Sequence, residues 1–539
     1  MDQLPAQNRP LLSNKTFYAV FLVLVIAILG VLVIWRVISP KTQTRGADYI
    51  EGLAKEKVTI AVLDKILGLY PNIPYDVDSF SINSNIFEGL TILRNGRLQP
   101  ALAESWTNPD KLTWRIRLRN VKFHSGDLLK ASDVKYTIEE AKKNKDWMSN
   151  TMASRVDSVN VIDERTVELK TKNPDPTLLY WMVYLFILSE DQVKKDSLGK
   201  AVGTGPYRLV SINENEAVFE ANNNYWAGIP KVKKLVYKAF KDQQAQAQGL
   251  ADGEADVGLL FKKTLNETLK SKGFRIIESR LGYVGFLGFD INNKKAKYVE
   301  ADKNPFSDVR VRKAMLLTLD VNEIIKNSGR EGEPLTQLAT SELIGFNTKL
   351  RRPEPNVKEA KKLLTEAGFP NGFTVTLDAL ETSELASEQI KNQLAEIGIK
   401  VKLNIFSDFN GFIDKLYAGD SSFYYFGYVS DTLDSVDLLN TLVHPTDERG
   451  NGSANFSSYS NAELDSILDK ASTIFDVKER AEITTQAHKK VMDQLPLIPM
   501  STTIGFFAVR NDVAFKPAPF GYIFGFELSG RQKASSTAQ

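Results

Sequence analysis

The stretch from Asn85 to Val134, NIFEGLTILRNGRLQPALAESWTNPDKLTWRIRLRNVKFHSGDLLKASDV, decides the fold of this chain. It contains several short motifs in a fixed order. They are Asn85, Gly89 and Leu90; Leu98, Pro100, Leu102, Ala103, Ser105 and Trp106; Leu118 and Arg119; Phe123, His124 and Gly126; and Ala131, Asp133 and Val134. No single motif is specific, but so many in one order are hard to obtain by chance.

Further motifs follow along the chain. They are Gly203-Thr-Gly-Pro-Tyr207, Asn224-Tyr-Trp226, Gly253-Glu-Ala-Asp256, Pro305-Phe306 with Val311-Arg312, Gly427-Tyr-Val-Ser-Asp431, and Pro496 to Pro499. Together with the first stretch, they resemble the family 5 extracellular solute-binding proteins, the peptide-capture subunits of ABC importers. The resemblance implies a protein that binds and hands over a ligand, and that is not an enzyme.

Composition sets the outer bounds. The chain has 539 residues, of which 43% are apolar and 25% charged, so it is long enough for two or more lobes. Basic and acidic residues nearly cancel, 68 against 66, which gives no sign of nucleic-acid binding. Cysteine is absent, and this excludes disulfides, thiolate metal sites and cysteine nucleophiles.

The N-terminal region predicts a membrane anchor. Residues 17–35 form an uncharged run of 19 residues, long enough as a helix to cross a hydrocarbon core of roughly 30 Å. A cleaved signal peptide is the alternative, although its apolar region is usually only about 7–15 residues long. We therefore expect a tail at 1–16, a transmembrane anchor at 17–36 and a linker at 37–55. Flanking charges do not decide the orientation; the resemblance places the large domain outside the cytoplasm.

Hydrophobic periodicity predicts a mixed α/β chain. The expected strands are 58–63, 114–118, 166–170, 373–377 and 399–405, and the expected helices are 357–367, 386–397, 459–471 and 477–492. Asn356 is a candidate N-cap, and Gly368 is a natural helix stop. The order strand, helix, strand over 373–405 has no hairpin signal, so it predicts a crossover with parallel pairing.

The resemblance also implies an architecture. It is an α/β fold of the periplasmic-binding-protein type, with two lobes, a hinge and a central cleft that closes on a ligand. Lobe I is expected to span 56–285, with 500–530 returning to it, lobe II to span 286–499, and a tail to cover 531–539. We expect a monomer that works with ABC transporter permease subunits and needs no cofactor.

Six residues are candidate ligand contacts. In peptide-binding relatives the aspartate matching Asp431 pairs with the peptide's α-amino group, because a buried ammonium needs an opposite charge. Its neighbours Tyr428 and Ser430 are included, as are Asn83, Asn85 and Ile86 near the N-terminus. The alternative interpretation of Asp431 is a helix cap, and that of the two asparagines is a turn or cap residue. Residues 423–428 are interpreted as a buried strand rich in aromatic residues.

Other readings stay open or are disfavoured. Arg312 suggests a carboxylate clamp, but an ion pair with Asp308 or Asp320 is the simpler expectation. The three histidines are too far apart in sequence for a metal site, and no hydrolase elbow or phosphate loop is present. A ligand-sensing or chaperone-like domain of the same fold, or a membrane-tethered hydrolase, are the alternatives. The ligand itself, whether peptide, opine-like molecule, nickel chelate or sugar, is left open.

Overall fold

The computed structural model describes residues 49–67, 69, 76–94, 96–145, 147–196, 201–430 and 432–533. The expected anchor at 17–36 and the candidate ligand residue Asp431 lie outside these ranges. Within them, no helix has the length and apolar character needed to cross a membrane.

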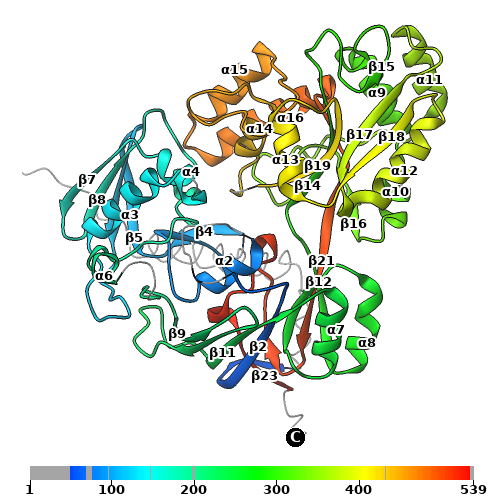
Figure 1. Ribbon diagram of the computed structural model, residues 1–539. Helices are drawn as coiled ribbons and strands as arrows, with labels where there is room; N and C mark the ends of the chain where they lie inside the picture. The colour runs from blue at the N-terminus through cyan, green and yellow to red at the C-terminus, as the bar shows by residue number, and fades with distance from the viewer. Residues whose placement is uncertain are drawn as a thin grey trace, which may run out of the picture. The chain divides into compact units, whose positions relative to one another are not determined.

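The first lobe is built on a mixed sheet (Figure 1). Its strand order is β13-β21-β12-β2-β11-β10-β9, and β16, which lies beside α10 in the second lobe, pairs with the first residues of β21. The central strand β2 runs parallel to both β11 and β12, and its last half is buried. The bounds are β2 (Lys55–Leu63), β9 (Tyr207–Ile212), β10 (Glu216–Ala221), β11 (Val232–Phe240), β12 (Val257–Leu260), β13 (Phe274–Arg280), β16 (Gly332–Pro334) and β21 (Ser501–Arg510).

A smaller antiparallel sheet, ordered β5-β6-β8-β7, extends the first lobe. Strand β6 alternates buried and exposed residues in its second half, and the three middle residues of β8 are buried. One face of this sheet packs against helix α3. The bounds here are α2 (Val77–Asn83), β3 (Thr91–Arg94), β4 (Arg97–Pro100), β5 (Ala103–Asp110), β6 (Thr113–Leu118), α3 (Ala131–Lys143), α4 (Met148–Ser154), β7 (Ser158–Asp163), β8 (Thr166–Lys170), α5 (Leu178–Trp181) and α6 (Glu190–Asp196). The remaining elements are β1 (Tyr49–Leu53), α7 (Gln243–Ala251), α8 (Asn266–Ser271), β22 (Val513–Ala514) and β23 (Ser529–Lys533).

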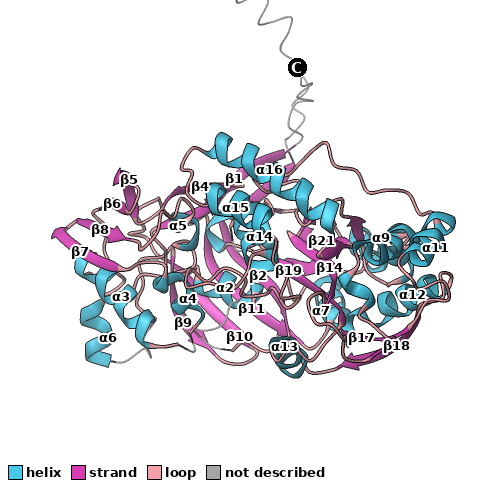
Figure 2. Cartoon of the chain, turned by 90° about the horizontal axis from the view of Figure 1, so that it is seen from above, coloured by secondary structure: helices cyan, strands magenta, loops and turns pink. Residues whose placement is uncertain are grey.

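The second lobe surrounds a sheet of order β15-β17-β19-β14-β20, with β18 on the free side of β17. The chain moves outward from β17 to β18 and then back to β19. Since such crossovers are right-handed, helices α12 and α13 fall on opposite faces of this sheet, as Figures 1 and 2 show. The strands are β14 (Tyr283–Phe289), β15 (Val299–Glu300), β17 (Thr374–Leu380), β18 (Lys400–Phe406), β19 (Phe423–Val429) and β20 (Leu497–Pro499). The helices are α9 (Val309–Thr318), α10 (Val321–Asn327), α11 (Val357–Glu366), α12 (Glu384–Ala395), α13 (Phe409–Tyr417), α14 (Ser435–Val443), α15 (Ala462–Ala471) and α16 (Val477–Gln494).

The hydrophobic cores follow this division. One buried cluster draws all its members from residues 284–500. The other runs from Val58 to Val257 and resumes at Phe507, with Leu433 as its only buried member between those points among the described residues. The lobe boundaries predicted from the sequence, at 286 and 500, stay a prediction.

The predicted crossover is confirmed. Strands β17 and β18 pair in parallel from Thr374↔Lys400 to Leu380↔Phe406, and α12 connects them. The predicted cap is also present, since the Asn356 side chain accepts a hydrogen bond from the Glu359 amide at 3.0 Å. The structure differs from the sequence reading mainly at element ends, where α15 begins at Ala462 instead of Tyr459.

Candidate functional site

Two chain segments connect the lobes and hydrogen-bond to each other. The first joins β13 to β14 through Leu281 and Gly282, and the second joins β20 to β21 through Met500. The Leu281 amide donates to Thr503 O at 3.1 Å, and the Met500 amide donates to Gly285 O at 2.7 Å. The crossings therefore form one paired unit, which is where bending between the lobes is expected.

The β19 strand brings the Gly427-Tyr428 motif to these crossings. Its last residue, Val429, lies opposite Tyr283, the first residue of β14. The Tyr283 ring lies over Gly427, where an added Cβ would come closer than 3.0 Å to the ring. A glycine in the interior of a strand often marks such a close approach. The described part of this strand therefore ends beside the hinge.

The three candidate residues on this segment have different surroundings. The Tyr428 side chain points to the other face of the sheet, because side chains alternate along a strand. It is partly buried and packs against the hydrophobic core of lobe II. The Ser430 side chain is 1% exposed, and its hydroxyl donates to Thr432 O. Asp431 lies outside the described residues, so its ligand role stays a prediction. The helix that follows is capped by Asp434, which accepts from the Val436 amide at 3.1 Å; this disfavours the alternative reading of Asp431 as that cap.

The N-terminal candidates lie at the centre of the first lobe. Asn85 is 1% exposed and donates from Nδ2 to Ser81 O at 2.8 Å and to the Tyr237 hydroxyl at 2.9 Å. Ile86 is fully buried. Asn83 is 5% exposed, and its buried Oδ1 has no hydrogen-bond partner in the described part of the chain. Of the three, Asn83 alone keeps a polar atom unsatisfied, and the ligand role of all three stays a prediction.

The motifs that carried the resemblance meet around these residues. The Gly205 amide donates to Ile86 O and the Tyr207 amide to Asn85 O, each at 2.8 Å. The amide of His124 donates to Gly203 O at 2.8 Å, and its ring Nε2 lies 3.0 Å from Gly205 O. Motifs that are far apart in the sequence thus form one hydrogen-bonded unit in the first lobe.

A cavity of about 420 Å³ opens at the carboxyl ends of β2 and β12. Ligands in open α/β sheets bind at this edge, where the strand order reverses. Its polar lining includes Asp64, Lys65, Asp76 and Asp78, and Leu281 of the first crossing also lines it. Burial raises the pKa of Asp78 to about 7, although its carboxylate accepts from the Leu63 amide at 3.0 Å. The sequence reading missed this cavity, even though the strand ends at Leu63 and Leu260 were the available signal.

A smaller hollow lies on the lobe II side of the hinge. It is lined by the Tyr283 and Tyr425 rings, by Arg330 and Glu331 after α10, and by hydroxyl residues after β17 and in β21, which are Thr382, Ser383, Ser501, Thr502 and Thr503. The Thr502 hydroxyl is buried without a hydrogen-bond partner in the described ranges. Except for the Glu331 carboxylate, the lining is rich in groups that donate hydrogen bonds, which suits a bound anion.

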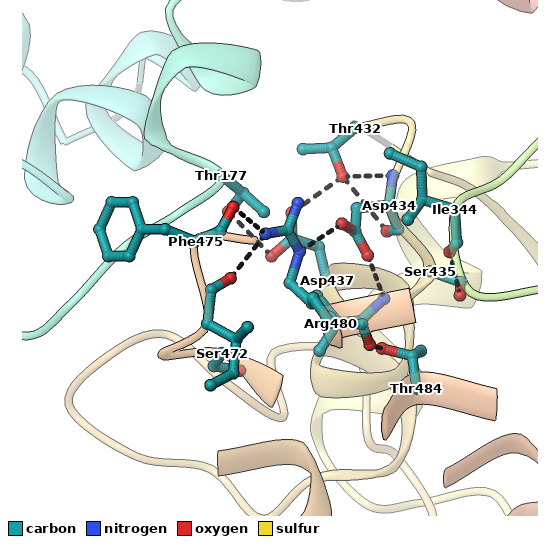
Figure 3. A network of polar contacts seen from close by, with 12 residues as sticks. Thr177, Ile344, Thr432, Asp434, Ser435, Asp437, Ser472, Phe475, Arg480 and Thr484 are labelled. Carbon is teal, nitrogen blue, oxygen red and sulfur yellow. Dashed lines mark hydrogen bonds and ion pairs between the residues drawn. The ribbon is translucent and has the colours of Figure 1, made fainter. Parts of the chain in front are cut away.

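A buried polar network lies directly behind the β19–α14 connection (Figure 3). Arg480 of α16 pairs with Asp434 at 2.7 Å, and their side chains are 2% and 0% exposed. The Arg480 Nη1 also donates to Ile474 O at 2.6 Å. Thr432 donates to the Asp437 carboxylate at 2.8 Å. Since nearly fifty residues separate Arg480 from Asp434, no sequence pattern signalled this pair.

Other charged residues are structural. Arg312 is 3% exposed and donates to three backbone carbonyls, those of Leu495, Gln494 and Phe306. The expected ion pair of Arg312 was wrong, because Asp308 pairs with Arg310 at 2.6 Å. No group of three metal-ligating side chains occurs in the described residues.

Comparison with known proteins agrees with this geometry. Residues 97–450, well over half of the chain, match the model of the bacterial extracellular solute-binding proteins, family 5 Middle. Among curated relatives, heme-binding protein A of Haemophilus influenzae is 25% identical over 86% of this chain and 91% of its own. Di/tripeptide-binding protein 1 of Pseudomonas aeruginosa is 25% identical over 82% and 88%.

Solved structures share the fold. HbpA2 of Haemophilus parasuis superposes with a TM-score of 0.76 at 24% identity, covering 88% of this chain and all of that one. The oligopeptide-binding protein AppA of Bacillus subtilis, bound to a nonapeptide, gives a TM-score of 0.71 at 20% identity, covering 89% and 99%. The chain therefore belongs to family 5 of the bacterial extracellular solute-binding proteins, non-enzymatic proteins that hold a solute for an ABC importer outside the cytoplasm.

Proposed function

We propose that this protein captures peptides, or similar small solutes with a free amino group, between its two lobes and delivers them to ABC importer permease subunits. Residues 17–36 anchor it in the membrane with the large domain outside. Curated and structural relatives support the solute class only broadly, since their names include heme, glutathione, di- and tripeptides and a nickel–histidine complex.

One observation carries the choice of an amino group. Strand β19 ends opposite Tyr283 at the crossing between the lobes, and Asp431 comes two residues later. We infer that the Asp431 carboxylate binds the amino group of a solute held between the lobes, as the matching aspartate does in peptide-binding relatives. The cavity next to the same crossing is lined by three carboxylates and one lysine. This excess of acidic groups favours a cationic group in the solute.

The hollow near Arg330 supplies a partner for the opposite end of a peptide. Arg330 is exposed, and no ion pair joins it to an acidic side chain in the described ranges. A guanidinium with nearby hydroxyls binds a carboxylate with charge-assisted hydrogen bonds. A solute with an ammonium at Asp431 and a carboxylate at Arg330 is a short peptide with free ends.

The first test measures the ammonium contact. Solute that co-purifies with the protein is identified by mass spectrometry, and its affinity is then measured by calorimetry. Asp431→Asn is expected to weaken binding by roughly 1.5–3 kcal/mol, the range for a hydrogen bond to a charged group. Asp414→Asn, at an exposed position on α13, is the matched control. Unchanged affinity in Asp431→Asn rules the contact out.

The second test measures the carboxylate contact. A peptide with an amidated C-terminus is expected to bind wild type more weakly than the free acid. The Arg330→Gln variant is expected to bind the two peptides equally. If the variant still prefers the free acid, another residue holds the carboxylate.

The third test concerns anchoring and transport. We expect the full-length chain to fractionate with membranes and a chain lacking residues 1–36 to be released. Permease subunits are expected to co-purify with the full-length protein. Their absence, with solute binding intact, would favour a ligand-sensing or chaperone-like role.

A further inference from the structure

The lobes touch through a polar contact that lies far from the hinge in the sequence. Thr177, just before α5 of lobe I, directs its hydroxyl at Asp437 of α14 in lobe II, with 3.2 Å between Oγ1 and Oδ1. Close by, the Trp114 and Phe475 rings pack with centroids 5.6 Å apart. Figure 3 shows Thr177 approaching the lobe II network from the other lobe.

The same aspartate also holds the connection that carries the predicted ligand residue. The Asp437 Oδ2 accepts a hydrogen bond from Thr432 at 2.8 Å, and Thr432 directly follows Asp431. Ser430, on the other side, donates to Thr432 O. We call residues 430–432 the ligand segment. The Asp437 carboxylate thus faces the Thr432 hydroxyl of this segment with Oδ2 and the Thr177 hydroxyl of lobe I with Oδ1.

At this contact one hydroxyl proton faces two carboxylates, which is one proton too few if both carboxylates are ionised. The single hydroxyl proton of Thr177 faces two carboxylates, Asp175 Oδ1 at 2.9 Å and Asp437 Oδ1 at 3.2 Å. The Arg155 Nη2 donates to the Thr177 oxygen and its Nε pairs with Asp175 at 2.8 Å, and neither of these bonds supplies a proton between Thr177 and Asp437. A protonated Asp437 donates to Thr177 instead, and Thr177 then keeps its bond to Asp175.

The neighbouring arginines form ion pairs with carboxylates other than that of Asp437. In lobe I, Arg155 is taken by Asp175; in lobe II, Arg480 is taken by Asp434. Tyr180 faces this cluster from α5 and is uncharged near neutral pH, since burial raises its pKa. His488 touches Ser435 at the start of α14, but burial lowers its pKa to about 3, so it is neutral as well. No basic side chain pairs with Asp437 among the described residues.

We propose that Asp437 is a positioning residue which ties the ligand segment to lobe I, and that closing of the lobes at this contact takes up one proton. The proposal rests on the proposed function in one respect, that the lobes open and close around a solute. Solute capture is then stronger in mildly acidic surroundings, whatever the solute.

The electrostatics of the closed arrangement agree with this. Burial, and then the nearby Asp434 and Asp175, raise the pKa of Asp437 to about 7, although Arg155 and the Thr432 hydroxyl oppose the shift. When the lobes separate, Asp437 meets water and its pKa falls toward about 4. The closed arrangement is therefore favoured below the lower value, and this advantage is lost as the pH rises through about 7. Between pH 8 and pH 6 the closing equilibrium changes about tenfold.

The experiment follows closure without any solute. Since the chain has no cysteine, Thr151→Cys on α4 and Ser466→Cys on α15 place one dye on each lobe at exposed positions of the full-length protein. Energy transfer is expected to show the closing constant rising about tenfold from pH 8 to pH 6. Asp437→Asn, whose amide donates as the protonated acid does, is expected to close equally at both pH values. A pH-independent wild type, or an Asp437→Asn variant that keeps the dependence, overturns the proposal.

A second pair of variants guards against misfolding of Asp437→Asn. Thr177→Ser keeps the hydroxyl and is expected to keep the pH dependence, while Thr177→Val loses the contact and closes less at pH 6. Equal behaviour of these two variants would also contradict the proposal. No solute is present in this measurement, so it can be interpreted even if the protein does not bind peptides. A negative result here would not contradict the proposal that the solute is a peptide.

Discussion

Removal of the Arg480 guanidinium is expected to destabilise lobe II by about 3–5 kcal/mol, the cost of leaving one partner of a buried ion pair uncompensated. In Arg480→Met, the Asp434 carboxylate keeps only the Val436 amide at 3.1 Å from its former partners, at a position where its side chain is 0% exposed. The carbonyl of Ile474 also loses its donor. Burial already raises the pKa of Asp434 and Arg480 opposes that shift, so the variant should bind a proton there at higher pH.

The assay separates the lobes by their fluorophores. All six tryptophans, Trp35, Trp106, Trp114, Trp147, Trp181 and Trp226, precede lobe II. In a Trp114→Phe background, which removes the tryptophan that packs against Phe475 of lobe II, tryptophan fluorescence follows lobe I during urea unfolding, while circular dichroism follows both lobes. We expect Arg480→Met to shift an early transition seen by circular dichroism and to move the fluorescence transition much less.

Two controls sharpen this result. Arg310→Met breaks the exposed pair with Asp308 and is expected to cost about 0–1 kcal/mol. Replacement of both partners, Asp434→Leu with Arg480→Met, is expected to recover most of the loss, because the buried charge is then gone. If Arg480→Met costs less than about 1 kcal/mol, the pair is not a dominant contact in lobe II and the reasoning fails.

Three further predictions concern packing and pH. Gly203→Ala is expected to cost about 3 kcal/mol or more in thermal unfolding, because its Cβ would lie closer than 3.0 Å to the Ile86 backbone carbonyl; a neutral result would mean that the turn can move. Gly427→Ala should cost about 1–3 kcal/mol in the wild-type chain and much less when it is added to Tyr283→Ala, since the clash is with that ring. The pKa of His488 is lowered to about 3 by burial, so its stability contribution is present above pH 6.5 and is lost as the pH falls toward 3. Wild type should therefore lose about 2 kcal/mol at pH 5 through this group, and His488→Gln should lose much less in a matched urea titration.

Local patterns predicted the regular elements well. The β17–α12–β18 crossover and the Asn356 cap depend on neighbouring residues, and each of them appears as expected. Asn85 shows what a family motif does not predict. The residue belongs to the motif and was predicted to contact the ligand, but its side chain donates hydrogen bonds to the Tyr237 hydroxyl and to Ser81 O of α2.

Contacts between residues far apart in the chain could not be predicted from the sequence. Nothing in the spacing of Thr177 and Asp437, or of Asp434 and Arg480, indicates that they meet, because their partners are chosen by tertiary packing. Arg312 was expected to pair with a nearby acid for its helix position, but the end of α16 offers it backbone carbonyls instead. The cavity at the ends of β2 and β12 depends on which strands are neighbours, and this too is a property of the assembled sheet.

The position of β21 has a consequence for synthesis of the chain. It lies between β13 and β12, and β13 has no other strand partner among the described residues. When the ribosome has made β13, more than two hundred residues remain before Ser501 appears. Lobe II has all of its own strands before then and can fold first, while lobe I waits with an unpaired edge. A chain stalled before residue 501 should therefore hold a folded second lobe and an open, aggregation-prone first lobe. Residues 501–510 complete the main sheet of lobe I, so translation must pass residue 510 before the protein has two lobes to close.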